Sequence, residues 1–304
     1  MTITIVGPEI EPRLDWIALT DALAAGHALP RAEVADTFLY RGKDTLLTRS
    51  AWIDGLGLAV KAASVFPGNG PQGMPTINGA VNLFSDGDGT LAALVDFHLV
   101  TKWKTAGDSL LSARMLARPD ARDILIVGAG AVAESMVGAY SAAFHDARFH
   151  IWARNPEAAR AFAAKTGAIV EPDLKDAVER AEIIATATMA TEPIIRGEWL
   201  QPGTHLDLIG AYRPDMREAD SDTFRRACVY VDSRATTMGH IGEIMIPLAE
   251  GALTPARIRA DFYDLPDGLY VRDSDEDITV AKNGGGAHLD LMTARYILDT
   301  YLKG

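Results

Sequence analysis

The stretch that decides the fold is RDILIVGAGAVA, residues 122–133. An apolar run typical of a buried strand leads into a glycine-rich turn, and the helix-forming segment AVAESMVGAYSAAF follows it. In the pattern GxGxxG/A, Gly128 allows the tight turn, Gly130 lets the backbone approach a pyrophosphate, and the small Ala133 permits close packing of helix on strand. The strand before and the helix after are the context that supports such a motif. We therefore expect a dinucleotide at this turn.

Strands and helices alternate downstream of the glycine turn. Apolar runs of strand type interleave with segments of helical periodicity, and this alternation indicates a doubly wound parallel sheet of Rossmann type. The expected strands are RFHIWAR (148–154), IIATAT (183–188), HLDLIGA (205–211) and CVYVD (228–232), and the expected helices are PEAARAFAAKTG (156–167) and DLKDAVERA (173–181). The acidic run RDSDEDITV (272–280) is expected to form a solvated turn.

The first hundred residues show a different sequence pattern. After an expected strand at 2–6 and a helix at 13–28, short β-rich runs are separated by turn-forming Gly, Pro and Asp, which predicts an antiparallel or mixed sheet. The runs are DTLLTRSAW (44–52), LGLAVKAASVF (56–66), INGAVNLFS (77–85) and TLAALVDFHLV (90–100), and expected helices follow at 105–117 and 286–304. The fold predicted is α/β, with a Rossmann domain at 119–283 and an α+β substrate-binding and dimerisation domain formed by 1–118 with 284–304.

The composition of the chain argues against several classes of function. The chain has 304 residues and a net charge of −12, so it lacks the basic footprint of a nucleic-acid-binding protein. No apolar run approaches the roughly 20 residues that span a bilayer, and the N-terminus has no secretory pattern. The single Cys228 suits a reducing cytoplasm. The acidic run 272–280 lacks EF-hand spacing, so we expect no metal. We also expect no nucleic acid and no membrane among the partners.

The end of the second Rossmann strand bears on the choice of cofactor. An NAD site usually has an acidic residue there that holds the ribose hydroxyls. This chain has Arg154 and Asn155 instead, and Arg154 could pair with a 2′-phosphate. The sequence therefore favours NADP(H), with NAD(H) left open.

Taken together, several segments resemble the ornithine cyclodeaminase/mu-crystallin family. They are LAVKAASVFPGN (58–69), GMPTINGAVNLFS (73–85), TKWKTAGDSLLSARMLARPDA (101–121), ILIVGAGAVA (124–133), TATMATEPII (186–195), LIGAYRPDMREAD (208–220) and KNGGGAHLDL (282–291). The resemblance implies a substrate domain built from the N-terminal half plus the C-terminal helix, a Rossmann domain between them, and a homodimer joined through the substrate domains. Its members act on an α-amino or α-imino acid beside a nicotinamide.

The same resemblance implies cations that hold the substrate's α-carboxylate. The matching positions are Arg41, Lys61 and Lys104. Family members more often carry Arg at the last position, so Lys104 replaces a bidentate fork with a point charge. A second departure is Tyr212, which stands where ornithine cyclodeaminases have an aspartate thought to act on the substrate's side-chain amine, while Asp215 matches the other branch. Ornithine cyclodeaminase activity is therefore disfavoured.

The activity predicted is NAD(P)H-dependent reduction of an α-imino acid to the amino acid, with Lys61 as the catalytic proton relay. The substrates left open are Δ1-pyrroline-2-carboxylate, Δ1-piperideine-2-carboxylate, pyruvate with ammonia, and iminosuccinate, for which Lys102, Lys43 and Arg49 are further cations. The alternatives are an alanine dehydrogenase-like or ornithine cyclodeaminase activity, and a non-catalytic protein that binds a small molecule in the presence of NADPH. The residues expected at the cofactor are Gly128, Gly130, Ala131, Val132, Arg154, Asn155, Thr188, Met189, Gly210 and Asp290.

Overall fold

The computed structural model describes residues 3–304, which divide into two compact units. Within the described residues, the first comprises 3–104 with 286–304, and the second 105–285. The first border falls inside helix α2 (Phe97–Leu116), whereas the sequence suggested a border after residue 118.

The first unit is built on a six-stranded sheet of order β1-β6-β5-β4-β3-β2, in which all pairs are antiparallel except β1 with β6. Its strands are β1 (Thr4–Val6), β2 (Glu33–Arg41), β3 (Asp44–Ile53), β4 (Gly57–Val65), β5 (Ile77–Phe84) and β6 (Leu91–Asp96). The predicted mixed sheet is confirmed. Strand β2 was missed because its side chains are exposed and it shows no apolar alternation.

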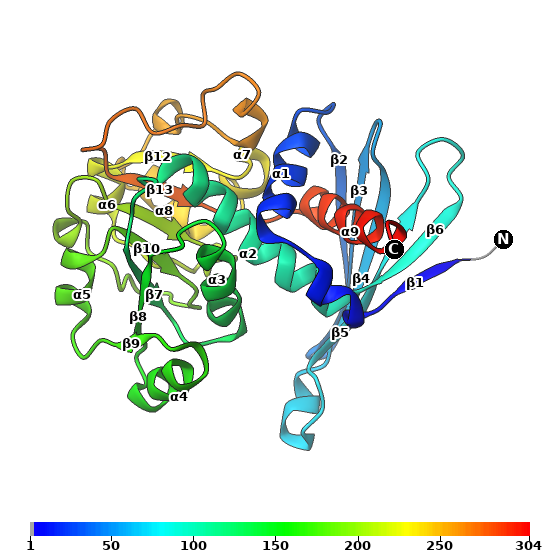
Figure 1. The fold of residues 1–304 in the computed structure, drawn as a ribbon, viewed down its shortest axis with the longest axis horizontal. Coiled ribbons are helices and arrows are strands. Elements are labelled where there is room, and N and C mark those ends of the chain that lie inside the picture. Colours follow the sequence, from blue (N-terminus) through cyan, green and yellow to red (C-terminus); the bar gives the residue numbers. More distant parts are fainter. Residues whose placement is uncertain (1–2) are drawn as a thin grey trace. The chain divides into compact units, whose positions relative to one another are not determined.

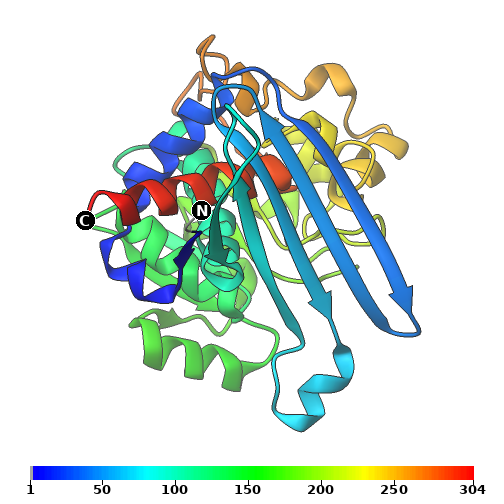
Figure 2. The same ribbon diagram turned by 90° about the vertical axis from the view of Figure 1, so that its right-hand side faces the viewer.

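Helix α9 (Ala287–Leu302) lies across one face of this sheet, as Figures 1 and 2 show. We call this the inner face, and its buried apolar residues include Ala51, Ala59, Val81 and Val95. The remaining helices of the unit are η1 (Pro8–Arg13), α1 (Trp16–His27) and η2 (Pro67–Gln72), together with the first turns of α2. Burial of this face joins the C-terminal helix to strands that lie in the first third of the sequence.

The start of α2 differs from the prediction. The sequence suggested a strand through residue 100 and a helix from 105, but β6 ends at Asp96 and the helix begins at Phe97. The Asp96 carboxylate accepts a hydrogen bond from the backbone N–H of Leu99 at 2.7 Å, the interaction that starts a helix. Lys104 is therefore a helical residue one turn beyond Thr101, and both lie on one side of α2.

The second unit contains a seven-stranded parallel sheet of order β12-β13-β11-β10-β7-β8-β9, which confirms the predicted Rossmann architecture. Its strands are β7 (Asp123–Val127), β8 (Arg148–Trp152), β9 (Ile169–Val170), β10 (Ile183–Thr186), β11 (His205–Leu208), β12 (Cys228–Val231) and β13 (Thr279–Lys282). The expectation that 272–280 forms a solvated turn is wrong at its end, because Thr279 and Val280 are buried in β13 between β11 and β12. Four adjacent carboxylates obscured this short strand.

Helices flank this sheet in the second unit (Figure 1). They are α3 (Ala131–Ser141), α4 (Pro156–Thr166), α5 (Leu174–Arg180), η3 (Gly197–Trp199), α6 (Ser221–Arg226), α7 (Arg234–Thr237), α8 (Gly242–Ala249), η4 (Pro255–Arg257) and η5 (Phe262–Asp264). Helix α4 ends as the sequence predicts, with Gly167 at φ 78°.

Candidate functional site

The glycine turn between β7 and α3 has the geometry of a phosphate cradle. Gly128 has φ 110°, and a Cβ there would lie 2.7 Å from the carbonyl oxygen of Ala187. A Cβ on Gly130 would meet nothing within 4 Å among the described residues, so the backbone is open at this point. Gly130 is also the N-cap of α3, and no described side chain caps it. Exposed backbone N–H groups at a helix N-terminus suit an anion, so these residues fit the pyrophosphate of a dinucleotide.

Two loops at the carboxyl ends of β10 and β11 are joined by one carboxylate. Glu218 accepts hydrogen bonds from the backbone N–H of Thr188 and its hydroxyl group, both at 2.7 Å, and from the backbone N–H of Gly210 at 2.8 Å. A Cβ on Gly210 would lie 2.0 Å from the carbonyl oxygen of Thr188. The loops therefore approach each other as closely as a glycine allows, next to the edge of the sheet where α/β proteins bind ligands. Met189 and Tyr212, in the same loops, are largely exposed.

Two buried charged residues, Glu243 and Lys282, bind the backbone of the loops that Glu218 joins. Glu243 on α8 accepts from the backbone N–H groups of Glu218 and Ala219, and Lys282 donates to the carbonyl oxygens of Leu208 and Ala211. Burial, followed by the charge of Glu218, raises the pKa of Glu243 to about 7. Burial also lowers the pKa of Lys282, although the surrounding carboxylates oppose that shift. None of these residues was expected in the site, although Glu218 and Lys282 lie in segments that resemble the family.

Arg154 and Asn155 follow β8 and are both exposed. The Asn155 side chain accepts a hydrogen bond from the backbone N–H of Glu157 at 3.0 Å and so caps α4. The predicted cofactor role of Asn155 thus competes with a capping role, whereas Arg154 projects from the end of the strand that conventionally faces the ribose.

A second group of functional side chains lies on the inner face of the first unit. Lys61 on β4 is 8% exposed, and its ammonium group donates to the hydroxyl oxygen of Thr101 at 2.8 Å and to Asp290 Oδ1 on α9 at 2.9 Å. The ring of Phe97 lies 4.8 Å from Lys61 Nζ. Asp290 Oδ2 is buried and has no hydrogen-bond partner among residues 3–304. This ion pair brings together two predicted site residues, and the cofactor role of Asp290 stays a prediction.

The electrostatic environment of Lys61 lowers its pKa. Burial is the main cause that lowers the pKa of Lys61, Asp290 opposes the shift, and the positive charges of Lys104 and Arg49 add to it. A lysine with a lowered pKa can release a proton closer to neutral pH than an exposed one.

Strand register shows which arginine shares a face with Lys61. Arg49 on β3 is directly opposite Lys61, whereas Arg41 is opposite Asp44 at the far end of the β2–β3 hairpin. Because side chains alternate along a strand, Arg41 points to the outer face, the side of the sheet away from α9. There it pairs with Asp44 and lies over the ring of Phe66. The structure therefore brings Lys104 and Arg49 near Lys61, but not Arg41.

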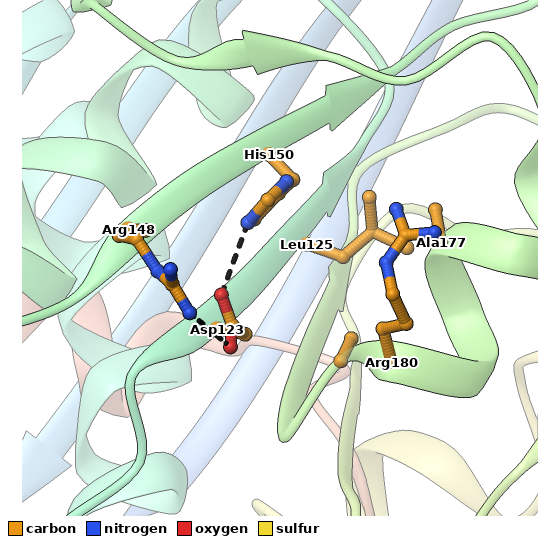
Figure 3. A pocket seen from close by; sticks show the side chains of 7 residues that line it. Asp123, Leu125, Arg148, His150, Ala177 and Arg180 are labelled. Atoms are coloured by element: carbon orange, nitrogen blue, oxygen red, sulfur yellow. Dashed lines mark hydrogen bonds and ion pairs between the residues drawn. The ribbon is translucent and has the colours of Figure 1, made fainter.

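A pocket of about 250 Å³ in the second unit is separate from the glycine turn (Figure 3). Asp123 at the start of β7 binds Arg148 at 2.8 Å and His150 at 3.2 Å, and Leu125 and Arg180 contribute to the lining. Since β7 begins at Asp123 and the glycine turn follows its other end, this pocket lies toward the amino-terminal edge of the sheet. It is not the site that the glycine motif predicts.

In residues 3–304 no group of three or more His, Cys, Asp or Glu side chains is arranged to hold a metal ion. Within the same range no helix combines the length and apolar character needed to cross a membrane.

Comparison with known sequences gives a consistent result. The model of the ornithine cyclodeaminase/mu-crystallin family matches residues 51–304. The chain is 50% identical over 292 residues to the Δ1-pyrroline-2-carboxylate reductase of Paracoccus denitrificans, an alignment that covers 94% of this chain and 92% of that protein.

Solved structures with the same fold include two with bound nicotinamide cofactors. The Δ1-pyrroline-2-carboxylate reductase of Thermococcus litoralis, in complex with NADH and L-proline, has a TM-score of 0.88 and 26% identity, and the match covers 99% of this chain and 98% of that one. An archaeal alanine dehydrogenase dimer with bound NAD has a TM-score of 0.89 and 25% identity, with 100% and 97% covered.

Replacing Glu218 with Gln should weaken NADH binding by about tenfold, because an amide can accept through only one oxygen and its NH2 group would face an N–H donor. Titration of NADH fluorescence measures this, with Glu198→Gln, an exposed position in the same unit, as the control. Unchanged affinity in a variant with an unaltered circular dichroism spectrum would show that the link between the two loops is not needed for the cofactor.

Proposed function

Because the chain belongs to the ornithine cyclodeaminase/mu-crystallin family, we propose that it reduces a cyclic α-imino acid of the Δ1-pyrroline-2-carboxylate type to the corresponding amino acid. It is an oxidoreductase that acts on C=N bonds with a nicotinamide cofactor. The observation that carries the substrate proposal is the buried Lys61–Asp290 pair beside Lys104, a site built for a small anion with a nitrogen that must be protonated. The 50% identical relative bears the name of this activity.

In this proposal Lys104 and Lys61 hold the substrate's carboxylate. Lys104 has no ion-pair partner among residues 3–304, so its charge is available to an anionic ligand. Thr101 fixes the Lys61 ammonium group from the α2 side, and Phe97 presents an apolar ring next to it. A flat ring that carries one carboxylate fits a site with a cationic end and an aromatic wall.

Lys61 also supplies the proton. The cofactor when bound supplies a hydride to the imine carbon, and the imine nitrogen takes a proton from Lys61, directly or through water. A protonated imine is the better hydride acceptor, and the lowered pKa of Lys61 makes the transfer easier near neutral pH. Asp290 Oδ2, which has no hydrogen-bond partner among residues 3–304, can accept a hydrogen bond from the iminium N–H. This contact offsets the repulsion between the iminium and the lysine ammonium groups.

Other activities in the family are less well supported. Tyr212 is 58% exposed, and Asp215 is tied to Arg213 at 2.8 Å on the surface, so neither replaces the missing cyclodeaminase aspartate. Linear imino acids, such as iminosuccinate or the imine formed from pyruvate and ammonia in an alanine dehydrogenase-like reaction, also carry a carboxylate. An assay with each substrate distinguishes them from the cyclic imine. Retention of Lys61 and Lys104 argues against a non-catalytic binding protein.

We also propose a cytoplasmic homodimer. The outer face of the first unit has a groove of about 480 Å³ lined by apolar side chains that include Trp52, Leu58 and Phe84, and Trp52 is 49% exposed. A sheet face of this kind suits a second copy of the chain. The archaeal alanine dehydrogenase of the same fold is described as a dimer.

We expect the purified protein to oxidise NADPH or NADH in the presence of Δ1-pyrroline-2-carboxylate, with slower turnover of pyruvate plus ammonium. Absorbance of the reduced nicotinamide follows the reaction, and chromatography identifies the amino acid product. Saturable cofactor binding without turnover of any imine would overturn the reductase proposal in favour of a binding protein.

Replacing Lys61 with Met should lower kcat with the cyclic imine by about 10²–10⁴-fold, the usual contribution of a general acid. Since Lys61→Met leaves the buried Asp290 without its partner, Lys61→Met/Asp290→Asn serves as a second variant, and Lys102→Met at an exposed lysine is the control. In the wild type the rate should fall as the pH rises through the lowered pKa of Lys61, because the free amine cannot donate. A falling limb that persists unchanged in Lys61→Arg would assign the proton to another group.

For the cofactor, we propose a preference for NADPH that depends on Arg154. Replacing Arg154 with Ser should lower kcat/KM for NADPH by about tenfold or more while NADH is little affected, because only NADPH carries the 2′-phosphate that the guanidinium would bind. Steady-state kinetics with both cofactors test this, with Arg160→Ser, an exposed arginine on α4, as the control. Equal losses with both cofactors would remove Arg154 from the discrimination.

A further inference from the structure

The pocket at the amino-terminal edge of the second unit's sheet is built from two strands and one helix (Figure 3). Strands β7 and β8 pair so that Asp123 is directly opposite Arg148 and Leu125 is directly opposite His150. Cross-strand partners point to the same face of a sheet, so these four side chains form one wall. Helix α5 packs on both strands and presents two alanines, whose small side chains leave a cavity of about 250 Å³.

A chain of hydrogen bonds links five side chains at this pocket, and four of them line it. Asp123 Oδ2 accepts from Arg148 at 2.8 Å, and Asp123 Oδ1 lies 3.2 Å from His150 Nε2. The other ring nitrogen of His150 lies 2.6 Å from Glu171 Oε1, and Glu171 Oε2 accepts from Arg180 at 2.8 Å. Both oxygens of each carboxylate therefore already have a partner.

The charges in this chain favour an anion. Burial would raise the pKa of Asp123, but the hydrogen bonds from Arg148 and His150 outweigh that effect and lower it, so this carboxylate is ionised at neutral pH. Ionised carboxylates only accept hydrogen bonds, so His150 binds both of its carboxylates only when its ring carries two protons. The chain then holds three positive and two negative charges.

The two arginines keep unused donors. A guanidinium carries five N–H groups on three nitrogens. Arg148 and Arg180 each donate from Nη2 alone, and their Nε and Nη1 atoms have no hydrogen-bond partner among residues 3–304. Figure 3 shows Arg148 on one side of the pocket with Asp123 and His150, and Arg180 on the other side near Ala177. Since the carboxylates are engaged and the guanidinium groups are not, the pocket offers donors to a ligand.

From this arrangement we propose that the pocket binds a small monocarboxylate with a short apolar body. The carboxylate takes the unused N–H groups of Arg148 or Arg180, a pairing that guanidinium geometry suits. The apolar body lies against Leu125, Ala177 and Ala181. An amino acid fits less well, because its ammonium group would need acceptors that are already engaged. The cavity is smaller than the roughly 300–1,000 Å³ of sites for drug-sized ligands, which limits the body to a few carbon atoms.

This site is separate from the proposed catalytic function. It lies within the second unit, at the edge of the sheet away from the glycine turn, and it contains none of the residues to which a role in the reaction is assigned. Its occupancy can therefore be measured by binding alone.

The experiment is isothermal titration calorimetry of the full chain with 3-methylbutanoate at low ionic strength. We expect a Kd of about 1 mM, as suits a small ligand held by one charged group. The neutral 3-methylbutanamide has nearly the same shape and should bind at least about tenfold more weakly. The Kd for the anion should rise with salt, because both arginines are more than half exposed.

Substitutions locate the binding. Arg148→Gln and Arg180→Gln should each weaken it by about tenfold, whereas Arg160→Gln, at an exposed arginine on α4 that also pairs with a carboxylate, should leave it unchanged. Ala177→Leu should abolish binding by filling the cavity while both guanidinium groups remain. Circular dichroism and the Tm report whether each variant folds, and Ala181→Leu takes the place of Ala177→Leu if the latter does not.

Four outcomes would overturn the inference. The first is absence of binding in the wild type, and the second is an equal loss in Arg160→Gln and Arg180→Gln, which would reflect net charge alone. The third is binding that Lys104→Met abolishes and Arg180→Gln retains, since the anion would then occupy the proposed substrate site. The fourth is inorganic phosphate that binds as tightly as 3-methylbutanoate with the same dependence on the variants, because the apolar wall would then contribute nothing.

Discussion

The ion pair between Lys61 and Asp290 is the interaction on which the first unit depends. Neither residue is stable as a buried charge by itself, since removing a charge from water costs several kcal/mol unless a partner meets it. The two residues are 229 positions apart, so the pair can form only when the C-terminal helix packs on the N-terminal sheet. The same requirement makes residues 286–304 part of the first unit although the whole dinucleotide-binding unit intervenes in the chain.

The dinucleotide-binding unit could be predicted from sequence because its signals are local. A strand, a glycine turn and a helix follow one another within residues 122–144, and each later strand is a short apolar run. Within this unit the sequence did not predict β9 and β13, because the signals of these two strands are not local. Strand β9 has only two residues. Strand β13 has four residues and follows a run of carboxylates. It is buried because it pairs with β11 and β12, which the sequence next to it does not indicate.

The side chains around Lys61 could be predicted only in part. Resemblance implied roles for Lys61, Lys104 and Arg41, and Arg49 was considered only as a further cation for a dicarboxylate. Which arginine shares a face with Lys61 depends on strand register, because a shift of one residue moves a side chain to the other face of a sheet. The roles of Glu218 and Glu243 were missed for a related reason, since a carboxylate that binds backbone N–H groups of distant loops leaves no spacing pattern in the sequence.

In the proposed reaction, the lowered pKa of Lys61 and the carboxylate of the substrate are linked. A bound carboxylate favours the charged form of a nearby lysine, so substrate binding at the proposed site would raise the pKa of Lys61 and help to load the proton that is transferred. Transfer of that proton to the imine nitrogen moves a positive charge from Lys61 to the ligand without adding one to the site. Asp290, which stabilises the ammonium group before transfer, can then stabilise the positive nitrogen of the ligand through its second oxygen. A single buried carboxylate can in this way stabilise the positive charge both before and after the proton moves, which is why an acid at this position benefits from having Asp290 as its partner.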